Sequence, residues 1–329
     1  MLKKILHYPA KNLVLVIPIA LITGFITGYF TDTGFLKGAI LPLTFLMIYP
    51  TMIGFKISEA YNLTHIRVLL FSLLLNFAAI PLLAYLIGLA LLQGQPEMLA
   101  GLVLASLLPT SGMTISWTMI FKGNVPAAIK MTAVGLITGS LLAPWYLWVM
   151  VGKMVPINVG QLFITISVIV FLPMIFGHLT FRLLRKRLTQ EEFQKRIKPY
   201  LPSFSIWAML LIIFSSISMK AKMIILEPEL IVNGIVVLVV FYTVNFALST
   251  AVGRTFFDRG DGIALVYGTV MRNLSISLGV ALAAFGVKAA LIVTLAFIIQ
   301  VQSAAWYGKL AEKHGLFRDR ILNITREEA

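Results

Sequence analysis

Ten runs of apolar residues, each roughly 18 to 27 residues long, fill most of this sequence. A helix needs about 20 apolar residues to cross the hydrocarbon of a bilayer. Lipid offers no hydrogen-bond partner, so each backbone N–H and C=O in the span must be paired within the protein, as in a helix. Of the 329 residues, 59% are hydrophobic and 12% are charged. Ten such runs leave only short connections and tails, so the chain has no room for a sizeable soluble domain. The sequence therefore predicts an all-α integral membrane protein with about ten transmembrane helices. The expected spans are 13–30, 36–53, 68–92, 98–121, 125–151, 159–184, 201–219, 230–252, 262–285 and 287–307.

The Lys and Arg residues are distributed unequally between the two sides of this ten-span topology. Of the 27, twenty fall in tails and connections on one side, and Lys130 and Arg272 lie within spans. By the positive-inside rule, both termini are expected in the cytoplasm and the protein in the cell membrane. The net charge of +14 then reflects topology and contact with anionic membrane lipid, and no nucleic acid partner is expected. The five cations expected on the opposite side are Lys37, Lys153, Lys220, Lys222 and Lys288.

One connection is long and highly charged, and it divides the chain. Residues 1–184 hold spans one to six, which are a first set of five and the start of a second. Residues 185–200 are expected to form a basic cytoplasmic loop, and residues 201–329 hold the last four spans and a short tail.

Short motifs of the first five spans recur in order in the last five. Because each unit holds five spans, an odd number, the second copy must be inverted in the membrane. Inverted repeats of this kind are typical of secondary transporters, which bind solute near the bilayer midplane. The recurring pairs are 76–78 with 245–247, 114–116 with 275–277, 127–128 with 289–290, Thr132 with Thr294, and 145–146 with 306–307, the last four in a register of 161 or 162 residues.

The fourth and ninth spans carry the features of broken helices. Pro109 cannot donate a backbone hydrogen bond, and Gly112 tolerates unusual backbone angles. Arg272 and Asn273 lie at the matching depth of the ninth span. A polar cluster at this depth is expected to face protein or a water-filled cavity. The alternative at Pro109 is an ordinary kink.

The interior of the expected bundle has cations but no carboxylate, because every Asp and Glu falls at a span end, loop or tail. Arg272 and Lys130 therefore suit an anion or a polar oxygen-bearing solute. Alternatively, these cations occupy the volume and charge of lost cation sites, and Lys130 can also extend to the cytoplasmic interface.

Other functional classes fit the sequence poorly. The chain has no cysteine, and its four histidines lie near span ends without an acidic partner at metal-ligand spacing. We therefore expect no enzyme, metal or cofactor. A channel needs a continuous polar stripe, whereas the polar residues here concentrate at two breaks.

Four motifs together resemble the bile acid:sodium symporter superfamily. They are "LMIYPTMIGFKI" around Tyr49, the Asn76 segment with Pro81, the Pro109 break followed by "FKGNVPAA", and "MRNLSIS" around Arg272. Within this superfamily they are most similar to the arsenical-resistance permease branch. The resemblance implies two inverted five-helix repeats. Spans three to five and eight to ten would form a core with crossing broken helices four and nine, and spans one, two, six and seven a panel.

The resemblance also identifies where this chain departs from the family's binding residues. A glutamate that ligates sodium in the symporter branch corresponds to Gly268, and a glutamine to Arg272. The Ser-Asn ligand pair corresponds to 114–115, the hydroxyl early in span five to Ala128, and Thr132 matches. The metalloid-handling cysteine of the arsenite branch corresponds to Thr110, whose hydroxyl is not a soft ligand.

We therefore expect a secondary active transporter that moves a small anionic or polar solute by alternating access, including a metalloid oxyanion or arsenite as in an arsenite-exporter-like permease. The alternative is a sodium-coupled, bile-acid-like organic-anion symporter with altered ion sites. The sequence leaves the oligomeric state open. The candidate substrate-binding residues are Asn76, Thr110, Ser111, Thr114, Arg272, Asn273 and Ser275, with Lys130, Thr132 and Asn245 as second choices.

Overall fold

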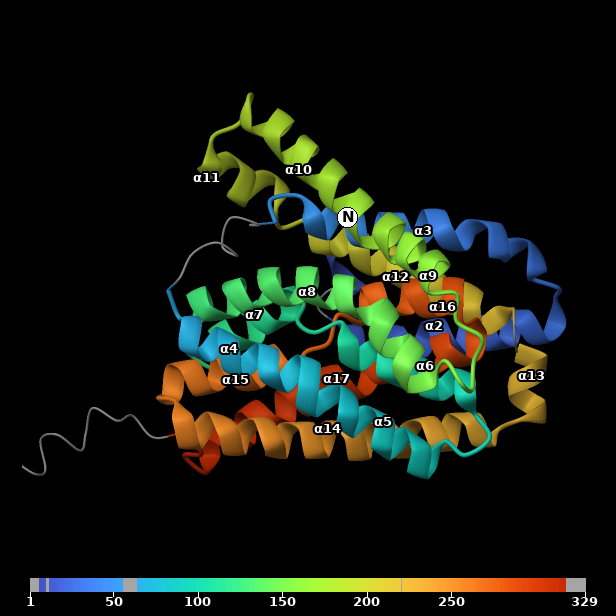
Figure 1. Ribbon diagram of the computed structural model, residues 1–329. Helices are drawn as coiled ribbons and strands as arrows, with labels where there is room; N and C mark the ends of the chain where they lie inside the picture. The colour runs from blue at the N-terminus through green and yellow to red at the C-terminus, as the bar shows by residue number, and fades with distance from the viewer. Residues whose placement is uncertain (1–5, 10–11, 56–63, 220, 318–329) are drawn as a thin grey trace, which may run out of the picture.

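The computed structural model describes residues 6–9, 12–55, 64–219 and 221–317, and within them the regular elements are helical (Figure 1). Of the cations counted in the charge argument, eight lie outside this part: Lys3, Lys4, Lys11, Lys56, Lys220, Arg318, Arg320 and Arg326. Seven helical segments are long and apolar enough to cross a membrane, and shorter apolar helices accompany them. The expected all-α membrane class is confirmed. The seven are Gly34–Met52, Ile66–Leu91, Val125–Val151, Val159–Arg185, Gln190–Ser218, Glu229–Phe256 and Val287–Lys313.

The helices follow one another with short connections. The elements of the first half are α2 (Leu13–Phe30), η1 (Gly34–Ala39), α3 (Ile40–Met52), α4 (Ile66–Leu74), η3 (Leu75–Ala79), α5 (Ile80–Leu91), α6 (Pro96–Leu107), α7 (Gly112–Ile120) and α8 (Val125–Val151). Those of the second half are α9 (Val159–Ile166), η4 (Ser167–Phe171), α10 (Leu172–Arg185), α11 (Gln190–Glu192), η5 (Phe193–Ile197), α12 (Leu201–Ser218), α13 (Ala221–Leu226), α14 (Glu229–Phe256), α15 (Arg259–Val270), α16 (Leu274–Ala284) and α17 (Val287–Lys313). Three of the short elements, η3, η4 and η5, are π-helical turns, and η1 is a 3-10 helix.

Two expected spans are each split into two helices. The span 98–121 is divided into α6 and α7, and the span 262–285 into α15 and α16. Pro109 lies in a gap of four residues between α6 and α7, so it marks a break and not a kink. The prediction of two broken helices is confirmed.

A proline within the third span explains the π turn that precedes it. Pro81 has no N–H to give to the carbonyl of Phe77 four residues before, and its ring crowds that carbonyl. The wider turn η3 accommodates the ring, and the hydroxyl of Tyr146 on α8 donates to the freed Phe77 carbonyl. Asn76 lies in this turn, so the local distortion fixes the position of a candidate site residue.

Two groups of helices pack closely among themselves, and α2 and α3 of the first group also contact α17 and α16. In the first group, α12 packs along α2 and α3, and α10 packs on α3. Gly28 of α2 lies so close to the backbone of Ser218 on α12 that a Cβ would be 1.9 Å from the Ser218 carbonyl oxygen. In the second group, α6, α7, α8, α14, α15 and α17 pack on one another, with α14 at the bottom of Figure 1.

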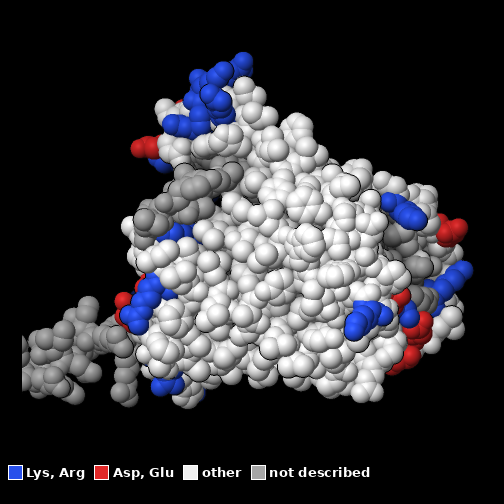
Figure 2. Space-filling view, in the orientation of Figure 1, with Lys and Arg blue, Asp and Glu red and all other residues white. Residues whose placement is uncertain are grey.

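Charged side chains gather at the two ends of the long helices and on the projecting α10 to α11 segment. Figure 2 shows an uncharged surface between these ends. Such a band is what a hydrocarbon layer requires, since a charge there is costly.

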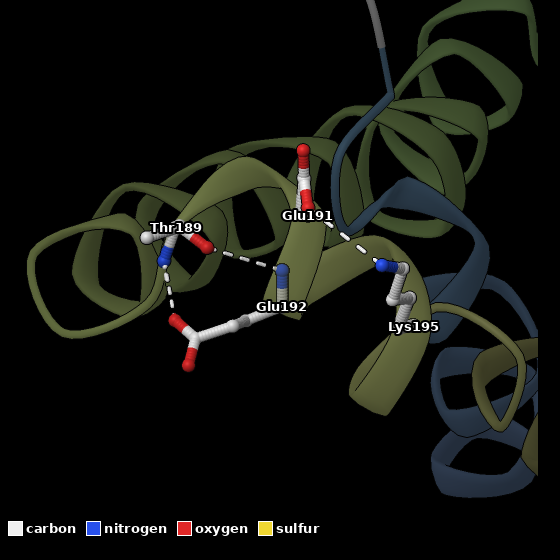
Figure 3. Close-up of polar contacts among 4 residues, drawn as sticks. All are labelled: Thr189, Glu191, Glu192 and Lys195. Atoms are coloured by element: carbon white, nitrogen blue, oxygen red, sulfur yellow. Dashed lines mark hydrogen bonds and ion pairs between the residues drawn. The ribbon is translucent and has the colours of Figure 1, made fainter.

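Residues 185–200 were expected to form a loop. From Gln190 to Ile197 they are instead helical, in α11 and η5, and α12 begins at Leu201. Thr189 caps α11: the Thr189 N–H donates to the Glu192 carboxylate at 2.9 Å, and the Glu192 N–H donates to the Thr189 hydroxyl at 3.2 Å (Figure 3). The hydrogen bond from the Thr189 N–H to the carboxylate holds the pKa of the Glu192 carboxyl below its ordinary value. Phe193 is buried against Phe181, with ring centroids 4.9 Å apart.

Candidate functional site

The two breaks lie against each other in the middle of the molecule. Pro109 and Arg272 pair in an antiparallel bridge, and the Asn273 N–H donates to the Leu108 carbonyl at 2.8 Å. The carboxyl ends of α6 and α15 and the amino ends of α7 and α16 therefore meet there. Each carboxyl end carries carbonyls without a helical partner and each amino end carries N–H groups without one, so the crossing needs polar groups of both kinds.

The side chain of Arg272 donates hydrogen bonds to carbonyls at both carboxyl ends. It is 1% exposed, and its Nη1 donates to the Ser106 carbonyl of α6 at 3.0 Å. Its Nη2 donates to the Thr269 carbonyl of α15. Among the described residues, no Asp or Glu lies within ion-pair distance of the guanidinium. A positive charge at the carboxyl end of a helix is favourable because it opposes the negative end of the helix dipole.

Polar side chains also cap the two amino ends. The Ser111 hydroxyl accepts from the Met113 N–H at 3.2 Å, and the Thr114 hydroxyl accepts from the Ser111 N–H at 3.2 Å. Asn273 caps α16 by accepting from the Ile276 N–H at 3.4 Å. Three candidate residues therefore already satisfy helix ends, although Ser111 and Asn273 remain partly exposed.

The two asparagines of the repeated motif converge on the last turn of α15. Asn76 donates to the Gly268 carbonyl at 3.1 Å, and Asn245 donates to the Thr269 carbonyl at 3.2 Å. The Asn245 side-chain oxygen accepts from Ser249 at 3.2 Å. The Asn76 Oδ1 atom is buried and has no hydrogen-bond partner in the described part of the chain. An unpartnered buried acceptor marks Asn76 as a group that could bind a donor from a solute.

The remaining candidates divide into those beside the crossing and one that points away. Thr110 is buried with φ +62°, a left-handed value that a β-branched residue rarely adopts. Its hydroxyl donates to the Pro109 carbonyl at 2.7 Å and reaches the Thr132 carbonyl at 3.5 Å. Ser275 is partly exposed. Lys130 is buried, and its ammonium donates to the Thr64 carbonyl just before α4, at the expected cytoplasmic end.

Sequence reasoning missed Gln300, which is 1% exposed on α17. Its side-chain oxygen accepts from the Arg272 N–H at 2.7 Å and from the Tyr242 hydroxyl at 2.9 Å. The available signal was a pair of amides, Gln300 and Gln302, within an apolar run.

Comparison with known proteins identifies the family. Residues 41–227, more than half of the chain, match the family model described as the sodium bile acid symporter family. The chain belongs to this family. It is therefore a multi-pass membrane transporter and not an enzyme.

Two relatives of this symporter-family chain show how far it has diverged. It is 25% identical over 264 residues to the uncharacterized protein YbaS of Bacillus subtilis, covering 79% of this chain and 83% of the relative. It is 22% identical over 257 residues to the arsenical-resistance protein Acr3 of Corynebacterium glutamicum, covering 74% and 70%. Both similarities agree with the resemblance noted from the motifs.

A cleft of roughly 720 Å³ opens at one end of this transporter, away from the crossing, where the connections before α4, before α8 and before α15 meet. Its charged lining residues are Arg67, Lys122 and Arg259 and the acidic Asp258 and Asp261. None of the three cations has an ion-pair partner in the described part of the chain. Asn124 ties its walls together by donating to the Asp261 carboxylate at 2.6 Å and to His65 Nδ1 at 3.0 Å.

Proposed function

We propose that this family member is a secondary active transporter that moves a small anionic or polar solute by alternating access. The observation that carries the proposal is the meeting of four half-helix ends at Pro109 and Arg272. Transporters of this type bind solute near the midplane, where interrupted helices present backbone dipoles to it.

The packing supports two bodies that move against each other. In this proposal α4 to α8 and α14 to α17 form a core made from two inverted repeats, and α2, α3, α9, α10 and α12 form a panel. The convergence of Asn76 and Asn245 on adjacent carbonyls of α15 is consistent with two related units that share one centre. The proposed division of the chain remains 1–184, 185–200 and 201–329.

The solute would bind at the amino ends of α7 and α16. These ends favour negative charge through their dipoles and N–H groups. Ser111, Asn273 and Ser275 are the partly exposed polar groups there. Thr110, Thr114 and Arg272 lie behind them as buried groups that fix the geometry, with Thr132 and Asn245 in support. Asn76 is also buried, and its Oδ1 atom, which has no partner in the described part of the chain, would accept from a donor on the solute. Lys130 is the weakest candidate, because its ammonium is bonded to the Thr64 carbonyl.

The cleft at the end of the bundle would be the cytoplasmic mouth, in keeping with cytoplasmic termini. Its lining has three cations, Arg67, Lys122 and Arg259, against two acidic residues, Asp258 and Asp261. The remaining positive charge would raise the local concentration of anions. The same cations would contact anionic lipid at the membrane surface.

A metalloid oxyanion or arsenite is the first solute to test, because one relative is named for arsenical resistance. The second candidate is a sodium-coupled organic-anion symporter with altered ion sites, which the family description favours.

Arsenic retention in a bacterial host that lacks its own exporters tests the proposal. Cells would be loaded with arsenite while they express wild type, Arg272→Ala or Thr110→Cys. Lower retention with wild type but not with Arg272→Ala, at equal folded yield of the two proteins, supports export through the crossing. Export by Thr110→Cys alone would mean that the native solute differs. If neither exports despite good expression, arsenite is the wrong solute and organic anions would be screened with and without sodium.

A further inference from the structure

We infer that the guanidinium of Arg272 is a tethered cation that takes the place of a bound coupling ion, so that this transporter binds no sodium at its crossing. The family name implies sodium, and the residues at the crossing do not fit it. The part of the inference that concerns transport rests on the proposed function, whereas the part that concerns ion binding does not.

The crossing has a fixed demand for positive charge. The carboxyl end of a helix carries roughly half a negative charge, and two such ends, those of α6 and α15, face each other here. About one positive charge balances them. Arg272 supplies it through hydrogen bonds to one carbonyl of each helix, Ser106 and Thr269. A guanidinium is protonated at any physiological pH, so this charge is permanent.

Most of the oxygen atoms that a sodium ion would need are missing or already used. The Asn76 Oδ1 atom is buried beside the crossing without a partner among the described residues, but one free side-chain oxygen does not make a sodium site. Among the described residues, no group of three or more His, Cys, Asp or Glu side chains could hold a metal ion. The Thr114 hydroxyl reaches the Tyr267 carbonyl at 3.4 Å, and residue 128 is an alanine without an oxygen in its side chain.

The space for an acidic ligand is also occupied. A Cβ at Gly268 would lie 2.9 Å from Cε and 3.1 Å from the sulfur of Met131. A longer acidic side chain at position 268 would therefore displace Met131. A sodium ion at this position would meet a thioether, which is a poor ligand for it. The guanidinium of Arg272 already holds the carbonyl of the next residue, Thr269, and like charges in a buried site repel strongly.

The tethered cation has a functional consequence. A bound sodium ion leaves the protein during each transport cycle and so couples transport to its gradient. The guanidinium cannot leave, so the carbonyls of Ser106 and Thr269 are satisfied throughout the cycle. Binding and transport are expected to be independent of sodium.

The first experiment measures thermal unfolding of the purified full-length protein in equal concentrations of sodium chloride and choline chloride. The wild-type midpoint should be the same in both salts. Arg272→Gln should unfold at a lower temperature and regain part of the difference when guanidinium is added below denaturing concentration. Arg259→Gln, which removes an arginine from the end of the bundle, should show no such recovery.

Direct binding of radioactive sodium to the wild type keeps the test decisive if Arg272→Gln does not fold. No saturable binding is expected. Saturable sodium binding, or a wild-type midpoint that rises in sodium, would overturn the inference. Equal effects of guanidinium on Arg272→Gln and Arg259→Gln would also overturn it, because the crossing would then not be a cation site.

Transport assays separate this inference from the proposed function. If a solute is transported and its accumulation requires a sodium gradient, the proposed function stands and the inference fails. If no anionic or polar solute is transported, and sodium neither binds to the wild type nor changes its unfolding midpoint, the tethered cation stands and the proposed function fails.

Discussion

Gln300 of α17 pairs with the main chain of Arg272 through both atoms of its side-chain amide. Its Oε1 accepts from the Arg272 N–H at 2.7 Å, and its Nε2 donates to the Arg272 carbonyl at 3.2 Å. Arg272 lies between α15 and α16, outside both helices. The Gln300 amide satisfies its main-chain N–H and carbonyl, as a neighbouring β-strand would. Because the Tyr242 hydroxyl donates to the same Oε1 atom, α14, α17 and the break are held together.

Replacement of Gln300 by leucine should destabilise the protein without removing any group that touches solute. The Arg272 N–H and carbonyl and the Tyr242 hydroxyl would lose a partner in a buried site, and each such loss costs about 1–3 kcal/mol. Thermal unfolding of the purified variant measures the effect. Gln302→Leu, on the same helix but partly exposed, is the matched control and should unfold like wild type. Equal midpoints for the two variants would mean that Gln300 does not support the break.

The membrane fold and the position of the breaks were predictable from the sequence because they depend on local chemistry. Apolar runs require helices in lipid, and Pro109 cannot continue one. The contact between Pro109 and Arg272 was expected only through the resemblance and the repeat. The helical start of the segment 190–197 was not expected, although Thr189 and Glu192 have the spacing of a capping box.

The partners of the site residues were not predictable, because they depend on which helices are neighbours. The direction of Lys130 is set by the Thr64 carbonyl, which lies 66 residues away in the chain. Gln300 becomes important only because α17 passes the break in α15 and α16. For Arg272 the sequence left two roles open, an anion-facing group or a group that fills a lost cation site. Its hydrogen bonds to two carbonyls favour the second.

Gly139 on α8 should not tolerate even a methyl group. A Cβ at this position would be 2.5 Å from the Leu107 carbonyl oxygen and 3.0 Å from Cδ of Pro109, so α8 would be pushed away from the break. Gly139→Ala should therefore lower folded yield and transport together. Gly38→Ala, where a Cβ would meet nothing within 4 Å, is the control. Wild-type yield of Gly139→Ala would show that α8 and the break can separate without loss.

The cations of the cleft should raise the rate of capture of an anionic solute from the cytoplasmic side. Lys122→Asn with Arg259→Gln should raise the apparent KM several-fold at low ionic strength with little change in kcat. Asparagine is chosen because Lys122 has φ +56°, which asparagine adopts more readily than most residues. The difference should shrink at higher salt, where charges are screened beyond about 10 Å.

Vesicles of defined orientation provide the measurement for these cleft variants. The effect should appear only when solute is presented to the face that carries the cleft. Lys153→Gln, an exposed cation between α8 and α9, should leave that KM unchanged. A KM effect that persists at high salt would argue for direct contact with bound solute in place of long-range attraction.

The capping box of α11 should make the projecting segment sensitive to acid. The pKa of the Glu192 carboxyl is lowered in the folded protein by its hydrogen bonds with Thr189. The carboxylate therefore stabilises the helix above the pKa of an unfolded glutamate, about 4.3, and this contribution is lost as the pH falls through the lower folded value. Hydrogen exchange of residues 190–197 at a series of pH values, corrected for intrinsic rates, should show protection decreasing in that acidic range.

Glu192→Gln should lose part of the protection already at neutral pH. Glu191→Gln removes only an exposed ion pair with Lys195, at 3.6 Å, and should retain the protection because such pairs contribute little. Equal protection in the two variants would mean that the helix is held by Phe193 alone and not by its cap.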